Sequence, residues 1–424
     1  MKKKIVIFLA GLLGAFGFIQ EASAIPAFAR QMGMACSACH FQHFPLLNSF
    51  GRSFKASGFT MIGSQAKLEG ENLSTPSVLN VSALATAGYN NVSNQPPGTP
   101  SGSYMTPNGG GELSLFFGGR VSENVGFLSE LAFPDNAPSS SAAKLLMLWD
   151  VGGARAGLSL VANNAPSYSL ELLNTGANNA HRIMGEVGEV NASSGGKGNH
   201  VNVYSAAQYL GTDAGGHGAS LVAAGAMGFV NIGKYNLNAV GGTSSQSNEM
   251  STTYARGAFI FDLGGWDSAV GIQNFSGHVG STSEDSKATI IDGQMQGEMG
   301  GMPVGLYASC GRAPSNDVVG NIYNSLVVGP GGTTKRSCNI GGELGVIPHK
   351  ATVQLALRSG RDGGLDGENK DNAVMIGATY ELAQNVELSL HHTANSGSAY
   401  EINSTNTTIP TGKSQTTLLV QALF

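Results

Sequence analysis

The chain has 424 residues, of which 41% are hydrophobic and only 12% charged, and it carries a formal net charge of −5. This slight acidic excess argues against a nucleic-acid-binding protein, since such proteins present a basic surface. The charged fraction is also low for a soluble protein, in which about 25% of residues are charged.

Residues 1–24 have the pattern of a secretory signal peptide. Three lysines at positions 2–4 precede an apolar run at 5–19, and Ala22-Ser23-Ala24 offers small residues for cleavage before Ile25. The apolar run is too short to span a membrane as a helix. We therefore expect export from the cytoplasm into an oxidising compartment.

The segment 25–70 contains the motif Cys36-Ser37-Ala38-Cys39-His40. The pattern C-x-x-C-H is typical of c-type haem attachment, in which both thiols bond to the porphyrin and the histidine coordinates the iron. A zinc site would need a second ligand pair, and the other two cysteines lie about 270 residues further along the chain. We predict one covalent haem c, attached to Cys36 and Cys39, with His40 as the proximal axial ligand.

An amphipathic helix is predicted after the motif. Pro45 suits its first position and Gly58 its C-terminal cap, and apolar residues recur between them at near-helical spacing. The apolar stripe fits either an ordinary helix face or a face against a porphyrin. Arg52 and Lys55 lie on other faces and are candidates for contacts with the haem propionates. Because so short a segment cannot enclose a haem, the rest of the chain must supply walls.

The sixth ligand of the haem iron is a separate question. His43 follows His40 at a spacing that would place both on one side of the porphyrin, so it is a poor choice. Met61, just past the predicted helix, is the candidate, and methionine ligation raises the reduction potential. Four other methionines remain open as alternatives: Met32, Met34, Met295 and Met299.

The region 71–424 is predicted to form a transmembrane β-barrel. It is rich in glycine, serine, asparagine and alanine, and no apolar run in it is long enough for a transmembrane helix. Apolar and polar residues alternate in many short segments, such as those at 113–121, 145–151, 353–358 and 386–391. Alternation with apolar residues outward and polar residues inward is typical of an outer-membrane barrel with a wet lumen. A soluble β-sandwich or β-helix also alternates, but the low charge disfavours it.

The connections point to the same all-β architecture. Tight turns such as 152–153 and 264–265 alternate with long polar loops such as 310–338 and 395–414, and the last predicted strand ends in Phe424. Short turns on one side and long loops on the other are the arrangement of barrels in the outer membrane of Gram-negative bacteria. The length favours 16 strands if 163–199 is one elaborated loop, and gives 18 if 183–190 is a strand. The cytochrome module is then expected at or in the pore.

Two further features concern the barrel region. Cys310 and Cys338 bracket a long loop, and in an exported protein we predict that they form a disulfide rather than a metal site. A second loop carries four carboxylates, which are hard oxygen donors suited to attracting Fe(II), although a solvated acidic loop would have the same composition. These residues are Asp362, Asp366, Glu368 and Asp371.

The residues around the haem motif resemble one family. The stretch from Ala27 to His40, followed by Phe44-Pro45, Phe50-Gly51 and Gly58-Phe59, is similar to the fused monohaem cytochrome c–porins of iron-oxidising bacteria. The resemblance implies an iron(II) oxidase of the outer membrane. Such a protein takes electrons from extracellular Fe(II) at one haem and passes them to a periplasmic c-type cytochrome or another soluble acceptor.

Two alternatives remain open. The same architecture would suit a conduit that delivers electrons to oxidants outside the cell. It would also suit a porin whose haem is structural or sensory.

Overall fold

The structure is a computed structural model that describes residues 27–71, 73–93, 103–105, 113–133, 140–176, 203, 205–212, 215–237, 249–280, 282–324, 330–402, 404 and 412–424. The predicted signal peptide at 1–24 and the alternative strand at 183–190 lie outside these ranges.

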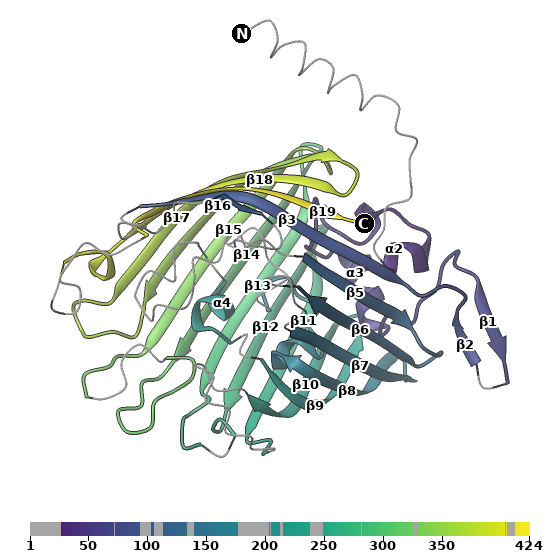
Figure 1. Ribbon diagram of the computed structural model, residues 1–424, viewed down its shortest axis with the longest axis horizontal. Helices are drawn as coiled ribbons and strands as arrows, with labels where there is room; N and C mark the ends of the chain where they lie inside the picture. Colours follow the sequence, from purple (N-terminus) through teal and green to yellow (C-terminus); the bar gives the residue numbers. More distant parts are fainter. Residues whose placement is uncertain are drawn as a thin grey trace, which may run out of the picture.

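The strands form a closed antiparallel barrel (Figure 1). Within the described residues, sixteen strands build the wall, each paired with its neighbours along the chain, and the last strand closes the barrel on the first. The three-residue strand β4 (Ser103–Met105) pairs at the edge of β3 beside β5. The all-β barrel with 16 strands is therefore confirmed. The wall strands are β3 (Val81–Val92), β5 (Leu113–Arg120), β6 (Val125–Ala132), β7 (Ser140–Val151), β8 (Ala154–Asn164), β9 (Gly216–Gly225), β10 (Gly228–Leu237), β11 (Thr252–Leu263), β12 (Trp266–Ser276), β13 (Ala288–Met299), β14 (Met302–Ala313), β15 (Lys335–Ile347), β16 (Ala351–Arg361), β17 (Lys370–Ala383), β18 (Val386–Ser396) and β19 (Ser414–Leu423).

The outer face of the barrel is apolar. In β16, Leu355 is 51% exposed while its neighbour Gln354 is only 5% exposed, as expected when successive side chains point to opposite faces. The same alternation leaves Ile272, Ile291, Ile340 and Ile376 exposed on other strands. A continuous apolar belt around a closed barrel is stable only in lipid, which places the protein in the outer membrane. No helix among the described residues is long and apolar enough to cross a membrane.

The two ends of the barrel differ. One end has tight turns such as Gly152-Gly153, Gly264-Gly265 and Gly300-Gly301, whose positive φ angles suit glycine in two-residue hairpins. The other end carries the long connections, including 277–287, 314–334 and 397–413. Since outer-membrane barrels keep short turns in the periplasm and long loops outside, the turn end is periplasmic.

The orientation of the strands can be tested by one substitution at two depths. Leu355→Arg places a charge on the outer face near the middle of β16 and should lower the free energy of unfolding by about 2–4 kcal/mol. Leu382→Arg makes the same change on the outer face of β17, beside the periplasmic turn, where the cost should fall to about 0–1 kcal/mol. Denaturant unfolding in lipid vesicles measures both. Equal costs would contradict the assigned membrane depth.

An N-terminal segment, defined as residues 27–66, lies at the periplasmic end. It contains α2 (Ala27–Met32), a 3₁₀ turn at Cys36–Ala38 and α3 (Ser49–Ala56). Figure 1 shows α2 and α3 at the same end of the barrel as the C-terminus. A two-stranded hairpin of β1 (Lys67–Gly70) and β2 (Leu73–Pro76) follows, so the predicted domain boundary at residue 70 falls inside this hairpin.

The predicted helix is present but begins later than expected. The helix α3 begins at Ser49 rather than at Pro45, because the side chain of Asn48 accepts a hydrogen bond from Gly51 N at 2.9 Å and caps the first turn. Its C-terminal end agrees with the prediction, since Gly58 has a φ of +74° just past the last turn.

Apolar residues of the N-terminal segment pack on the inner wall of the barrel. Phe54 and Phe59 pack in one apolar cluster with Leu146 and Leu148 of β7, both fully buried on the inner face. An added Cβ at Gly58 would come within 3.2 Å of Leu148 Cδ1, so this position needs glycine for close approach as well as for its φ. The segment therefore closes part of the periplasmic mouth.

A long connection between β8 and β9 fills much of the remaining interior. Residues 165–176, which we call the lumen loop, are almost entirely buried. The short helix α4 (Ala206–Leu210) packs against β13, β14 and β15. Because β8 pairs directly with β9, the barrel wall has no place between them for the extra pair of strands that the sequence allowed. Inward-facing polar residues such as Gln294 and Asn339 are buried rather than exposed to water. The prediction of a water-filled lumen is therefore wrong for the part of the barrel where they lie.

Candidate functional site

A cleft lies between the N-terminal segment and the barrel wall. It encloses about 900 Å³, including the part that opens to solvent. On one side are Cys36, His40 and His43, and on the other are residues of the β15–β16 and β17–β18 turns at the periplasmic rim. The residues contributed by these turns include His349, Lys350, Glu381, Asn385 and Glu387. The sequence motif therefore faces a space that only the complete barrel creates.

The two motif cysteines stand at the two ends of the 3₁₀ turn: Cys36 is its first residue, and Cys39 follows its last. Cys36 lines the cleft, and its Sγ donates a hydrogen bond to Asn385 Oδ1 at 3.5 Å. Cys39 is held by its backbone, since its carbonyl accepts a hydrogen bond from Asn48 N at 3.0 Å. The two cysteines do not form a disulfide. Burial raises the pKa of both thiols, so both are protonated at neutral pH.

His40 is oriented for coordination through one ring nitrogen. Its Nδ1 lies 3.1 Å from the carbonyl oxygen of Leu46, which accepts the Nδ1 proton. Burial lowers the pKa of His40 to about 4, so the ring is neutral at pH 7. A neutral imidazole whose Nδ1–H is held by a carbonyl presents Nε2 as its ligating atom.

A buried loop holds the carbonyl that orients His40. The side chain of Asn174, in the lumen loop, accepts a hydrogen bond from Leu47 N at 2.8 Å and donates one to Leu47 O at 3.0 Å. Leu46 itself is fully buried. The backbone at positions 46 and 47 is thereby fixed from the barrel side.

The arrangement fits a c-type haem by its donor chemistry. Two thiols and one neutral imidazole come from a single turn, and Cys36 and His40 line a cleft walled by other parts of the chain. These are the groups that covalent attachment and proximal coordination require. Cys36 and Cys39 would hold the porphyrin, and His40 would coordinate its iron.

The other predicted haem contacts lie elsewhere. The guanidinium of Arg52 pairs with Asp267 of β12 and lines a different depression, together with Ala226 and Ile260. Lys55 is half-buried, and partial loss of solvent lowers its pKa; it lies near the carboxylate of Glu171 rather than in the cleft. Neither residue is among those that line the cleft with Cys36 and His40.

The candidate sixth ligand is also outside the cleft. Met61 packs on the apolar cluster around Phe59, and its carbonyl accepts a hydrogen bond from Gln31 Nε2 at 2.6 Å. His43 lines the cleft but is already engaged, since Nε2 lies 2.8 Å from Glu343 Oε2 and Nδ1 lies 2.8 Å from Phe44 O. Met61 therefore lies outside the cleft, and His43, which lines the cleft, has both of its ring nitrogens in hydrogen bonds.

The His43–Glu343 pair predicts a pH-dependent stability. Although burial lowers the pKa of His43, the carboxylate of Glu343 more than offsets this and raises it to about 9. A raised folded-state pKa gives stability that is complete below the unfolded value of about 6.5 and is lost as pH rises through 9. His43→Gln should thus lower the thermal midpoint more at about pH 6 than at about pH 10. A constant difference would contradict this charge assignment.

The predicted acidic loop does not form one site. Asp371 is buried and pairs with Arg358, Asp362 is buried and accepts a hydrogen bond from Gly364 N, and Asp366 is 84% exposed beside Arg361. Within the described residues, no group of three or more acidic, histidine or cysteine side chains is placed to hold a metal ion. Glu368 accepts a hydrogen bond from Ser404 N at 3.1 Å, so each of the four carboxylates has a partner of its own.

The structure joins Cys310 and Cys338 in a disulfide. The two residues are directly opposed on β14 and β15, and both lie on the outer face of the barrel near the loop end. The bond links β14 and β15 near the ends that join the loop 314–334. It lies far from the cleft along the strands, so it takes no part in that site.

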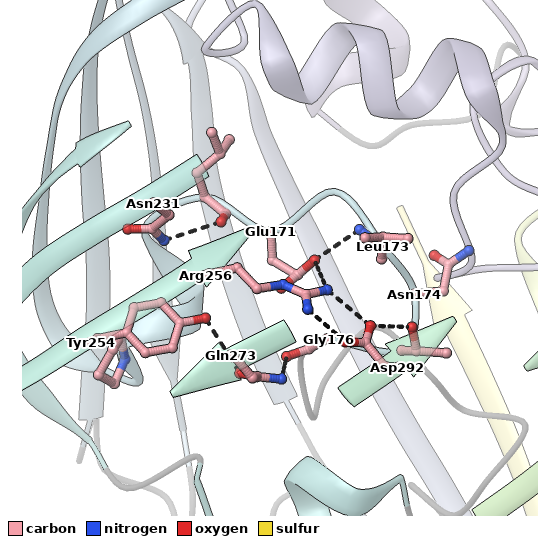
Figure 2. A network of polar contacts seen from close by, with 12 residues as sticks. Glu171, Leu173, Asn174, Gly176, Asn231, Tyr254, Arg256, Gln273 and Asp292 are labelled. Carbon is pink, nitrogen blue, oxygen red and sulfur yellow. Dashed lines mark hydrogen bonds and ion pairs between the residues drawn. The ribbon is translucent and has the colours of Figure 1, made fainter. Parts of the chain in front are cut away.

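Sequence reasoning missed a buried charge network in the lumen (Figure 2). Arg256 of β11 lies between Glu171 of the lumen loop and Asp292 of β13, with Nε 2.9 Å from Glu171 Oε2 and Nη2 2.9 Å from Asp292 Oδ2. Thr175 Oγ1 also donates to Asp292 Oδ2 at 2.6 Å. The network fixes the lumen loop to the wall. Its only sequence signal was an arginine in an otherwise weakly charged strand.

Comparisons with known proteins find structural similarity only. No protein-family model matches the chain, and no curated protein sequence matches it. The outer-membrane-expressed OmpT of Vibrio cholerae is 10% identical over 85% of this chain and 100% of that chain, with a TM-score of 0.47. A mutant porin of Rh. blastica is 14% identical over 82% of this chain and 100% of that chain, with a TM-score of 0.46. The outer membrane channel DcaP of Acinetobacter baumannii is 11% identical over 85% of this chain and 100% of that chain, with a TM-score of 0.44. The fold assignment rests on the closed barrel itself.

Proposed function

We propose that this outer-membrane barrel is an electron-transfer protein that oxidises extracellular Fe(II) and passes the electrons to a soluble periplasmic acceptor. The proposal rests on one observation above all. The C-x-x-C-H turn faces a cleft that the barrel completes at its periplasmic mouth. Cys36, Cys39 and His40 would hold one haem c there, and a bound haem supplies a one-electron carrier.

The chain's own residues prepare this site in three ways. The Leu46 carbonyl sets the tautomer of His40, as second-shell partners do for metal-bound histidines. The lumen loop holds that carbonyl in place through Asn174. The barrel wall covers the cleft on the side away from the segment and limits the access of water, which favours a higher potential.

The position of the cleft suits exchange with a periplasmic protein. It opens between short turns at the periplasmic rim, where Glu381 and Glu387 contribute negative charge beside Lys350. A mixed charged rim of this kind supports weak and rapid docking of an electron-transfer partner. Moving electrons rather than iron across the membrane would leave poorly soluble Fe(III) outside the cell.

A solute channel is the second candidate, and the fold supports it directly. A closed barrel of 16 strands is the architecture of porins, and it needs no haem to conduct solutes. In the described residues, however, the lumen loop and the N-terminal segment fill much of the interior.

Two measurements separate these functions. Reduction of the purified ferric protein by Fe(II) tests electron transfer. Uptake of a small sugar by vesicles that contain the protein tests the channel. Rapid uptake without reduction by Fe(II) would favour the porin.

A further inference from the structure

Four basic residues form a row on the outer face of the barrel at the loop end. Strand pairing places Arg312 of β14 directly opposite Arg336 of β15, Arg336 opposite Arg361 of β16, and Arg361 opposite Lys370 of β17. Each of these residues has the parity of the lipid-facing positions on its strand, such as Ile340 on β15 and Leu357 on β16. We call this set the basic row.

Such a row is unfavourable unless an anion neutralises it. Directly opposed residues on adjacent strands have side chains about 5 Å apart, and like charges in these positions destabilise a sheet. Within the described residues, only Arg361 has an acidic partner, Asp366 at 3.3 Å, and that carboxylate is largely exposed. An exposed pair of this kind is weak and easily exchanged for another anion.

The row also lies at the depth of lipid headgroups. Four residues further along the strands towards the membrane centre are the exposed apolar residues Ile340, Leu357 and Val374, about 13 Å away. Between the two levels lie the Cys310–Cys338 disulfide and small polar residues. The basic row and these residues line a shallow depression of about 1170 Å³, including its open part.

We propose that the basic row is a binding site for a phosphorylated glycolipid of the outer leaflet. The phosphates would contact the guanidinium groups of the row, which suit bidentate phosphate recognition, and the acyl chains would lie along the apolar belt below. The long loops place this end of the barrel outside the cell, where the outer leaflet of a Gram-negative outer membrane carries such lipids. The site does not depend on the haem.

The test is lipid binding by native mass spectrometry of the purified barrel in detergent. The probe is a diphosphorylated glycolipid of the lipid A type. Arg312→Gln with Arg336→Gln removes two opposed charges. Since each basic residue near an anionic surface contributes roughly a factor of five, the double variant should bind about 25-fold more weakly.

Matched variants make the result specific. Lys234→Gln with Lys413→Gln removes two exposed charges outside the row and should leave binding unchanged. Arg312→Lys with Arg336→Lys keeps the charge and should retain most of the binding, which also controls for folding. Equal binding by the wild type and the double glutamine variant would overturn the proposal.

Two further ligands distinguish the source of the phosphate. The dephosphorylated form of the same glycolipid should bind the wild type as weakly as the diphosphorylated lipid binds the double glutamine variant. Inorganic phosphate at millimolar concentration should not displace the lipid, because the acyl chains contribute to the contact. Equal binding of the dephosphorylated lipid, or ready displacement by phosphate, would contradict a site built for a phosphorylated lipid.

Discussion

Replacing Cys36 and Cys39 together by alanine should remove all covalently bound haem from the protein. The reason is that thioether bonds need these two thiols, and the only other cysteines, Cys310 and Cys338, form a disulfide on the outer face of the barrel. The measurement is the pyridine haemochrome absorbance of protein denatured before assay, so that only covalently attached haem is counted. The wild type should give one haem per chain.

The matched control for this result uses the other cysteine pair. Cys310→Ser with Cys338→Ser should keep the full haemochrome signal, although the barrel should become less stable by a few kcal/mol. A signal that survives in Cys36→Ala with Cys39→Ala would mean that haem attaches elsewhere. The absence of haem from the wild type, expressed with the periplasmic haem-attachment machinery, would remove the cofactor from the proposed function.

The largest effect on stability is expected at Arg256. Arg256→Met would leave the carboxylates of Glu171 and Asp292 buried without their cation. Breaking a buried ion pair by removing one partner costs about 3–5 kcal/mol, because a charge then remains in the interior without compensation. Denaturant unfolding in lipid vesicles measures this cost. Lys67→Met, which breaks an exposed pair with Glu69, should leave the unfolding midpoint almost unchanged, because water screens exposed ion pairs.

A charge-neutral variant tests whether the unpaired charges are the cause. Combining Arg256→Met with Glu171→Gln and Asp292→Asn should recover much of the lost stability, since no buried charge remains. The same network fixes the lumen loop, which positions the backbone beside His40 through Asn174. If the triple variant is as unstable as Arg256→Met alone, packing rather than charge would explain the loss.

The barrel was predictable because its signal repeats along the chain. Alternation of apolar and polar residues, tight glycine turns and long loops each occur many times, so errors at one segment do not change the architecture. The helix α3 was also predicted, although its start was misplaced. Pro45 suggested an N-terminal position, whereas the hydrogen bond from Gly51 N to the Asn48 side chain sets the first turn.

The contents of the lumen could not be predicted in the same way. Leu146 and Leu148 face inward yet are apolar, because α3 and Phe59 cover them. Together with Leu145 and Met147 they give β7 a run that is apolar on both faces. In a barrel strand, such a run indicates that protein packs on the inner wall. That signal was present in the sequence, but it does not show which segment provides the cover.

The cleft was predictable only in part. The motif identified Cys36, Cys39 and His40, because their spacing is local. The residues opposite them come from turns more than 300 positions later, including Asn385, and no local pattern links the two. Arg52 and Met61 lie close to the motif in sequence, but Arg52 pairs with Asp267 of the barrel, and Met61 packs on the apolar cluster around Phe59.

The most direct test of the proposed function is reduction of the protein by Fe(II). Purified ferric protein in detergent is mixed with excess Fe²⁺ without oxygen or mediator, and the absorbance of reduced haem is followed. The cysteine double variant, which should lack haem, supplies the background. The electron-transfer account predicts the full reduced spectrum in the wild type. A haem that stays ferric with Fe²⁺ but is reduced by dithionite would contradict iron oxidation.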